Sequence, residues 1–247
     1  MIFKESYWRI LEKYLNMLIL SIDSSTRGCS VAIHQNNILL ASSELYTDRS
    51  SSAMLTVLVE QVTTNAGFVL TDLDAVAVAK GPGSYTGLRV AVSTAKGLCY
   101  ALEKPLIGIN TLEAMSLQVK RFFDSRTYFC PMIDARRMEV YTAVYNFEGD
   151  TILPTNALIL DSNSFSELLE EHPVVFFGDG SSKFKTFVEA QSNALFLSDE
   201  IRPSARTIGL LAGESFKNQQ FEEIISFEPY YLKDFMSPPT KKKSLLG

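Results

Sequence analysis

The stretch from Leu73 to Ala101 constrains the fold of this chain most, because it joins a buried strand, a glycine turn and a helix. Val and Ala alternate from Leu73 to Ala79 in an apolar run of strand length. Strong turn formers then interrupt the run, namely Gly81, Pro82 and Gly83. A helix is expected from near Leu88, with Ser84 or Thr86 available to cap its first turn. The stretch therefore predicts a strand–turn–helix unit of an α/β protein.

The glycine turn is also a candidate anion site. A helix that begins after a glycine turn, at the carboxyl end of a strand, commonly binds phosphate or carboxylate groups. The glycines here follow G-x-G-x-x-x-G, which is one residue longer than the dinucleotide fingerprint, and no P-loop lysine follows them. The spacing alone favours a tight connection without a ligand over an anion site.

Composition limits the class of protein. The 247 residues suit one large domain or two small ones, and 46% hydrophobic residues, 21% charged residues and a mean hydropathy of +0.07 are typical of soluble globular proteins. A net charge of -5 argues against a domain that grips nucleic acid by itself. Widely spaced cysteines without a C-x-x-C pair fit a reducing cytoplasm. No apolar run reaches the roughly 18 residues that cross a bilayer, so we expect no membrane span.

The predicted elements follow one order twice. The first half has expected strands at Leu18–Ile22, Cys29–His34, Ile38–Leu45, Leu73–Ala79 and Leu106–Ile109, and expected helices at Ser50–Asn65 and Leu88–Leu102. The second half has expected strands at Tyr128–Ile133, Glu139–Phe147, Ile152–Leu160, Val174–Phe177 and Leu195–Ser198, and expected helices at Phe165–Glu171, Ser182–Ala190 and Ser204–Lys217. This repeat predicts two α/β lobes of the ribonuclease-H type, residues 17–115 and 116–236. An N-terminal extension (1–16) precedes the lobes and a flexible tail (237–247) follows them.

Six segments together resemble the TsaB family, also called YeaZ. They read ILSIDSSTRGCSVAI, GPGSYTGLRVAVSTAKGL, PLIGINTLEAMS, IDARRMEVYTAVY, FFGDGSSKF and EPYYLKDF, in order between Met17 and Phe235. The resemblance implies an α/β, actin-like ATPase (ASKHA) fold of two ribonuclease-H-like lobes. It also implies a bacterial partner of the related protein TsaD. With TsaD and the small ATPase TsaE, such partners help place a threonylcarbamoyl group on adenosine 37 of tRNAs that read ANN codons.

A comparison with TsaD predicts that this chain has no metal site. TsaD carries G-V-N-H-x-x-x-H, whose two histidines hold a metal from one face of a helix. The matching stretch here has Thr111 and Met115 at the histidine positions, and neither side chain holds a hard divalent cation well. His34 and His172, one in each predicted lobe, are too far apart in the chain to replace the pair. We therefore expect no metal and no catalytic residue.

The first turn of the chain resembles a degenerate nucleotide loop. In actin-like ATPases the corresponding turn lies beside the phosphates, and here it consists of Asp23, Ser24, Ser25 and Thr26. A turn in which Asp23 bonds to the local backbone is favoured, and weak nucleotide binding stays open. The resemblance implies no cofactor of the chain's own, with ATP used by the complex through other subunits. The alternatives are an actin-fold ATPase or small-molecule kinase, and a metallopeptidase-like protein.

By resemblance, the helices of the first lobe pack against TsaD, or against a second copy of the chain when TsaD is absent. The expected contact residues are Met54, Leu55, Leu58, Val62, Tyr85, Leu88, Arg89, Val92, Ala95 and Cys99. Their apolar character on more than one helix face favours an interface. On this hypothesis Leu88→Arg or Val92→Glu abolishes TsaD binding and leaves the fold intact. TsaE and tRNA are expected as partners only within the complex, in the cytoplasm and without a membrane.

Overall fold

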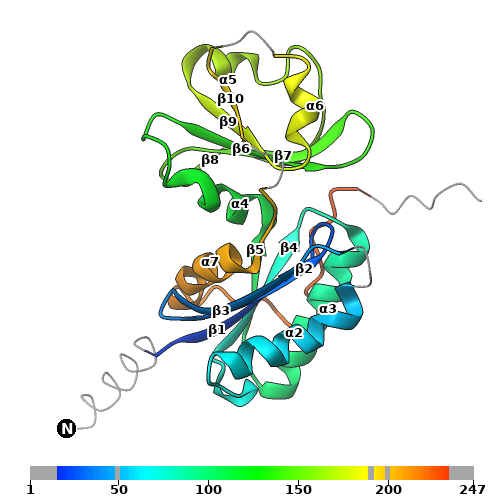
Figure 1. The fold of residues 1–247 in the computed structure, drawn as a ribbon, viewed down its shortest axis with the longest axis vertical. Helices are drawn as coiled ribbons and strands as arrows, with labels where there is room; N and C mark the ends of the chain where they lie inside the picture. Colours follow the sequence, from blue (N-terminus) through cyan, green and yellow to red (C-terminus); the bar gives the residue numbers. More distant parts are fainter. Residues whose placement is uncertain (1–15, 48–50, 189–191, 198–200, 234–247) are drawn as a thin grey trace, which may run out of the picture.

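The computed structural model describes residues 16–47, 51–188, 192–197 and 201–233, and it contains two lobes stacked along the long axis (Figure 1). Each lobe is built on a five-stranded sheet, in the order β3-β2-β1-β4-β5 in the first lobe and β10-β9-β6-β7-β8 in the second. The first sheet consists of β1 (Leu18–Asp23), β2 (Cys29–Gln35), β3 (Ile38–Leu45), β4 (Ala75–Gly81) and β5 (Leu106–Asn110). The second consists of β6 (Tyr128–Asp134), β7 (Glu139–Tyr145), β8 (Thr151–Ile159), β9 (Val174–Phe177) and β10 (Ala194–Phe196).

The two sheets share one topology. In the first, β1, β2 and β3 form antiparallel pairs, while β4 runs parallel to β1 and β5 runs parallel to β4. In the second, β6, β7 and β8 repeat the antiparallel pairs, and β9 and β10 repeat the parallel ones. The same order and polarity in consecutive halves confirm the predicted duplication of a ribonuclease-H-like lobe and hence the actin-like ATPase fold.

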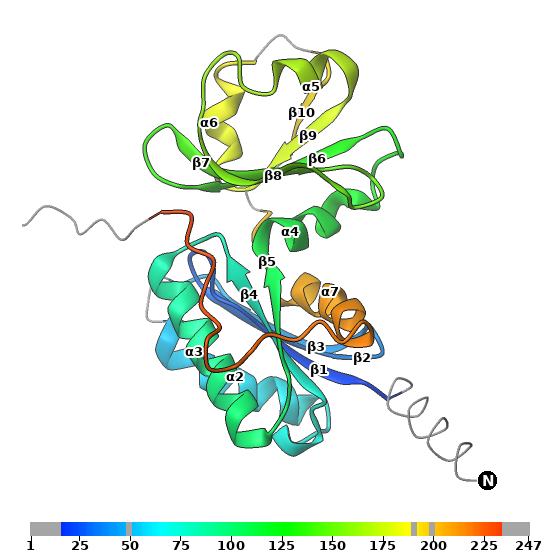
Figure 2. The same ribbon diagram turned by 180° about the vertical axis from the view of Figure 1, so that it is seen from behind.

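The helices are distributed between the lobes less simply than the strands. They are α2 (Ser51–Asn65), α3 (Tyr85–Leu102), α4 (Thr111–Lys120), α5 (Ser166–Glu171), α6 (Ser181–Lys185) and α7 (Ala205–Lys217), with a short 3-10 turn η1 (Leu70–Asp72). Helices α2 and α3 cover one face of the first sheet and α7 covers the other (Figure 2). Helix α4 follows β5 but packs on β6 and β7 of the second sheet. Helix α4 also contacts α7, β4 and β5, so it lies between the lobes, and the predicted boundary between residues 115 and 116 falls inside it. Helix α7, from the second half of the chain, belongs to the first lobe.

Most predicted elements are confirmed within two residues, and β3 and β9 have the predicted bounds. Helix α3 begins at Tyr85, three residues earlier than expected, because the Ser84 side chain accepts a hydrogen bond from the Gly87 N–H. Helix α4 was not among the predicted elements; the Asn110 side chain caps it by accepting from Leu112 and Glu113. Helix α6 ends at Lys185, well short of its predicted end.

Parts of some predictions lie outside the described residues. These are the extension up to residue 15, the tail, and the predicted element ends at Ser50, Ala190 and Ser198. Among the helices that the structure describes, none is both long and apolar enough to cross a membrane.

Candidate functional site

The glycine turn packs directly on the first loop of the chain. The Ser84 N–H donates to the Ser25 carbonyl at 2.6 Å. A Cβ atom on Gly83 would lie 2.2 Å from that same carbonyl oxygen, and one on Gly87 would lie 1.9 Å from the Ser24 carbonyl oxygen. The glycines therefore allow two backbone segments to approach each other. At the start of α3, this loop accepts from the Ser84 N–H and the Ser84 cap accepts from the Gly87 N–H.

The loop itself is organised around a buried carboxylate. The backbone N–H and the hydroxyl of Ser25 both donate to Asp23 Oδ1 at 2.8 Å, so Asp23 bonds to its local backbone as predicted. Asp23, Ser24 and Ser25 are buried, whereas Thr26 is half-buried. Burial raises the pKa of Asp23 to about 6, against the opposing effect of the Ser25 hydrogen bonds. Asp23 Oδ1 thus accepts two bonds from Ser25, whereas Asp23 Oδ2 is buried and has no hydrogen-bond partner among the described residues.

The two positions that correspond to the TsaD histidines are filled by packing. Thr111 and Met115 are fully buried, and Met115 lies in a cluster with Val119, Phe129 and Phe177. Within the described part of the chain, the Thr111 hydroxyl has no hydrogen-bond partner. Among the same residues, no group of three or more His, Cys, Asp or Glu side chains is placed to hold a metal ion.

The two histidines lie in different lobes and have structural surroundings. His34 on β2 is buried beside Gly209 of α7, and burial, with the nearby Arg206 charge, lowers its pKa to about 4. His172 stacks on the ring of Tyr128, with 4.1 Å between ring centroids.

The structure corrects the predicted interface residues. Most of them are buried within the first lobe itself: Leu55, Leu58, Val62, Leu88, Val92, Ala95 and Cys99. Their apolar spacing is real, but it faces the first sheet and not a second protein. A charge introduced by Leu88→Arg or Val92→Glu would enter the core, where an unpaired charge is very costly, so these variants would not leave the fold intact. Of the remaining residues, Met54 and Arg89 are exposed and Tyr85 is half-buried.

Helix α3 presents three sides. One side faces the core, and a second contacts the C-terminal segment through Tyr85, Arg89 and Lys96. The third side is open and carries small residues, including Gly97, where an added Cβ would meet none of the described atoms within 4 Å. Beside it, α2 exposes Met54 and Val57, at 37% and 38%.

The open surface of α2 and α3 is the candidate partner interface, and sequence reasoning named only Met54 from it. Its members are Met54, Val57, Val90, Gly97 and Ala101. The signal was present in the helical period, since residues 90, 94, 97 and 101 share one side of a helix whose opposite side was already assigned as apolar.

Known proteins resemble this chain over most of its length. The family model of TsaD, tRNA N6-adenosine threonylcarbamoyltransferase, matches residues 45–245. A Bacillus subtilis relative, tRNA threonylcarbamoyladenosine biosynthesis protein TsaB, is 32% identical over 70% of this chain and 76% of its own. The Escherichia coli protein of that name is 39% identical over 55% of this chain and 58% of its own. The structure of YeaZ from Pseudomonas aeruginosa superposes with a TM-score of 0.73 at 25% identity, covering 87% of this chain and all of that one.

Fold and site together define a two-lobed actin-like protein in which Asp23 bonds to its own loop and Met115 lies in a core cluster. The chain belongs to the TsaB family, also called YeaZ, within the wider TsaD family. The curated relatives compared above are named for tRNA threonylcarbamoyladenosine biosynthesis.

Proposed function

We propose that this chain is a non-catalytic subunit that binds and activates TsaD in threonylcarbamoylation of adenosine 37 of ANN-decoding tRNAs. The observation that carries the proposal is the open surface of α2 and α3, together with the burial of Thr111 and Met115 at the positions of the TsaD histidines. Family membership supplies the pathway. TsaE and tRNA join through the complex, ATP is used by the other subunits, and a second copy of this chain takes the place of TsaD in its absence.

The proposed contact uses helix packing. Gly97 and Ala101 let another helix approach α3 closely, while Met54 and Val57 supply apolar area along the neighbouring helix. Docking then favours the TsaD conformation that can use the threonylcarbamoyl adenylate and tRNA, because a partner that binds one conformation better raises its population. No chemistry by the subunit itself is needed.

Reconstitution tests the function. Purified TsaD, TsaE and the adenylate-forming enzyme are assayed for modified tRNA with and without this chain, and the chain is assayed alone. We expect product only when both TsaD and this chain are present. Product formed equally well without the chain would contradict the proposed function, and ATP turnover by the chain alone would favour the ATPase alternative.

A substitution on the open surface tests the interface separately. Gly97→Arg places a long side chain in open space and replaces a glycine within a helix, so the fold should be retained while TsaD binding is lost. Ile159→Arg is the matched control, because Ile159 is a 70% exposed apolar residue of the second lobe. Normal binding by Gly97→Arg, measured by calorimetry, would remove α3 from the interface.

A further inference from the structure

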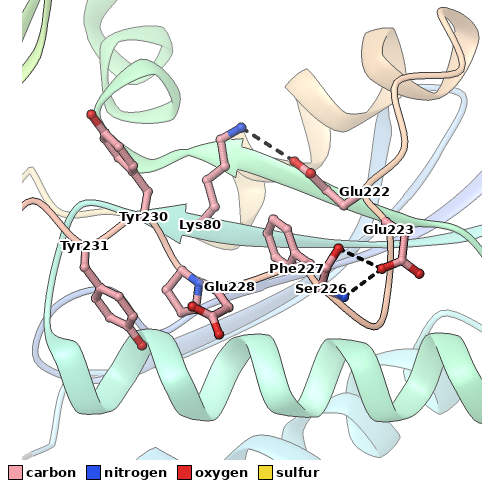
Figure 3. Close-up of a pocket in the computed structure, with 9 residues that line it drawn as sticks. Lys80, Glu222, Glu223, Ser226, Phe227, Glu228, Tyr230 and Tyr231 are labelled. Carbon is pink, nitrogen blue, oxygen red and sulfur yellow. Dashed lines mark hydrogen bonds and ion pairs between the residues drawn. The ribbon is translucent and has the colours of Figure 1, made fainter.

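The segment Glu222–Lys233, here called the strap, follows α7 and crosses the first lobe towards the gap between the lobes (Figure 2). It begins on the free edge of the first sheet, where the Glu222 N–H donates to the Leu106 carbonyl of β5 at 2.8 Å. The Glu222 carboxylate also pairs with Lys80 at 3.6 Å (Figure 3). These two contacts of Glu222 fix the beginning of the strap to the edge of the first sheet.

The middle of the strap is fixed to α3 and to the core. Lys96 Nζ donates to the carbonyls of Ile225 and Phe227, each at 2.9 Å. Phe227 is 9% exposed and joins the core cluster of the first lobe. A Cβ atom added at Gly108 of β5 would lie only 2.8 Å from the nearest carbon of the Phe227 ring. The glycine therefore leaves room for this ring.

The end of the strap is held at the first turn of α3. The Tyr230 N–H donates to the Lys80 carbonyl at 2.7 Å. The Tyr231 ring lies 4.7 Å from the ring of Tyr85, and Arg89 Nε donates to the Tyr231 hydroxyl at 3.2 Å. The Arg89 guanidinium also covers the Tyr85 ring at 4.6 Å. This aromatic and cationic cluster ties the strap to the helix that carries the open surface.

The last described residue of the strap reaches the second lobe. Lys233 forms an ion pair with Glu139 of β7, and its ammonium lies 6.0 Å from the centroid of the Tyr141 ring on the same strand. A second contact between the lobes, Asn110 Nδ2 to Thr155 Oγ1 at 2.9 Å, connects the end of β5 to β8. The strap is therefore one connection between the lobes, and the end of β5 and the packing of α4 on both lobes are others.

We propose that the strap is a clamp between the lobes, which couples the first turn of α3 to the orientation of the second lobe through Arg89, Tyr231 and Lys233. The inference concerns the chain alone and does not rest on the proposed function. If α3 is also the docking helix, the strap carries the effect of a bound partner to the second lobe.

A charge-reversal cycle tests the clamp on the full chain. Spin labels on cysteines introduced at Val69 and Ile159, which are 60% and 70% exposed on different lobes, report the distance between the lobes by pulsed electron resonance. The native cysteines are buried and are expected to stay unlabelled. Lys233→Glu should raise the population of lobe orientations in which the strap is detached from Glu139 by up to about five-fold. This is the change in population that corresponds to the free energy of an exposed ion pair.

The second half of the cycle distinguishes the effect of the specific Lys233–Glu139 ion pair from the effect of a change in net charge. Glu139→Lys should broaden the distance distribution in the same way, and the double variant with both charges exchanged should narrow it again. Tyr231→Ala should broaden it without changing either charge. Arg126→Glu, in an exposed pair with Asp124 on a loop of the second lobe, is the control and should have no effect. An unchanged distribution in Lys233→Glu, or no recovery in the double variant, would overturn the clamp.

Discussion

The glycines of α3 offer a test in which one substitution has opposite effects at two sites of one helix. Gly87 and Gly97 both lie in α3. An added Cβ at Gly87 would lie 1.9 Å from the Ser24 carbonyl oxygen, whereas at Gly97 it would meet none of the described atoms within 4 Å. Gly87→Ala should therefore destabilise the chain, and Gly97→Ala should stabilise it.

The magnitudes follow from two terms. Replacing Gly by Ala inside a helix stabilises it by about 1 kcal/mol, and this term applies at both positions. At Gly87 the obstructing atom belongs to the backbone, so either the loop or the helix must move by more than 1 Å to reach an ordinary contact. Overpacking costs about 1–3 kcal/mol and occasionally more, and so short an approach to a backbone atom belongs at the upper end of that range. We expect Gly87→Ala to lose about 2 kcal/mol net and Gly97→Ala to gain up to about 1 kcal/mol.

Thermal and urea unfolding followed by circular dichroism measure both effects. For a chain of this size, about 1 kcal/mol shifts the midpoint by roughly 2–4 °C. The two variants should therefore separate by about 6–12 °C, with the parent between them. All three proteins are compared at one low concentration, because association through the open surface would add stability. A Gly87→Ala protein as stable as the parent would refute the close approach of the glycine turn to the first loop.

Two further predictions concern buried groups. Burial raises the pKa of Asp23 from 3.8 to about 6 and lowers the pKa of His34 from 6.5 to about 4. As the pH falls, protonation of Asp23 therefore stabilises the folded state and protonation of His34 destabilises it. Each effect is roughly 3 kcal/mol at most. Asp23→Asn should therefore lose about 2 kcal/mol more than the parent between pH 6.5 and 4 in urea titrations, and parallel pH profiles would contradict this. Phe227→Ala should cost about 3–5 kcal/mol, whereas Ile225→Ala, which is 85% exposed, should change stability by less than about 0.5 kcal/mol. Equal effects of the two would show that the strap is not anchored through Phe227.

Local signals in the sequence were sufficient for the strands and for most turns. The turn between β2 and β3 contains Asn36 and Asn37, both with positive φ, and asparagine tolerates that conformation better than most residues. The strand that follows this turn, β3, has the predicted bounds. The repeated element order predicted a ribonuclease-H-like lobe for each half, and the topology of that lobe determines which strands pair.

The position of α7 could not be predicted in the same way. Its period shows an apolar side, but a period does not say which sheet that side covers. In the structure its glycines permit contact with the first lobe, since a Cβ on Gly209 would lie 2.2 Å from His34 Nδ1 and one on Gly213 would lie 1.7 Å from Asn37 Oδ1. These contacts join residues about 175 positions apart in the chain, and no local pattern records them.

Most residues predicted for the interface are buried in the first lobe, for a related physical reason. A helix that packs on its own sheet and a helix that packs on a partner need the same apolar spacing, so Leu55 and Val92 fit either role in the sequence. Only the path of the chain decides which side of α2 and α3 is covered. That path includes the strap, which covers the side of α3 that carries Arg89 and Lys96 and leaves the side with Gly97 open.

The interior packing around Met115 limits which substitutions the chain can accept. Met115 lies in a core cluster, and its methyl group is 2.9 Å from where a Cβ on Gly178 would be, so the space beside it is already tight. Histidines at positions 111 and 115 would have to bury polar rings there without partners, which costs free energy. Two substitutions alone would thus lower stability before they created a metal site. The outer side of α3 has no such constraint, since a change at Gly97 meets no described atom of the chain. Surface changes on this side are therefore available at little cost in stability, whereas a histidine pair at positions 111 and 115 requires repacking of the core.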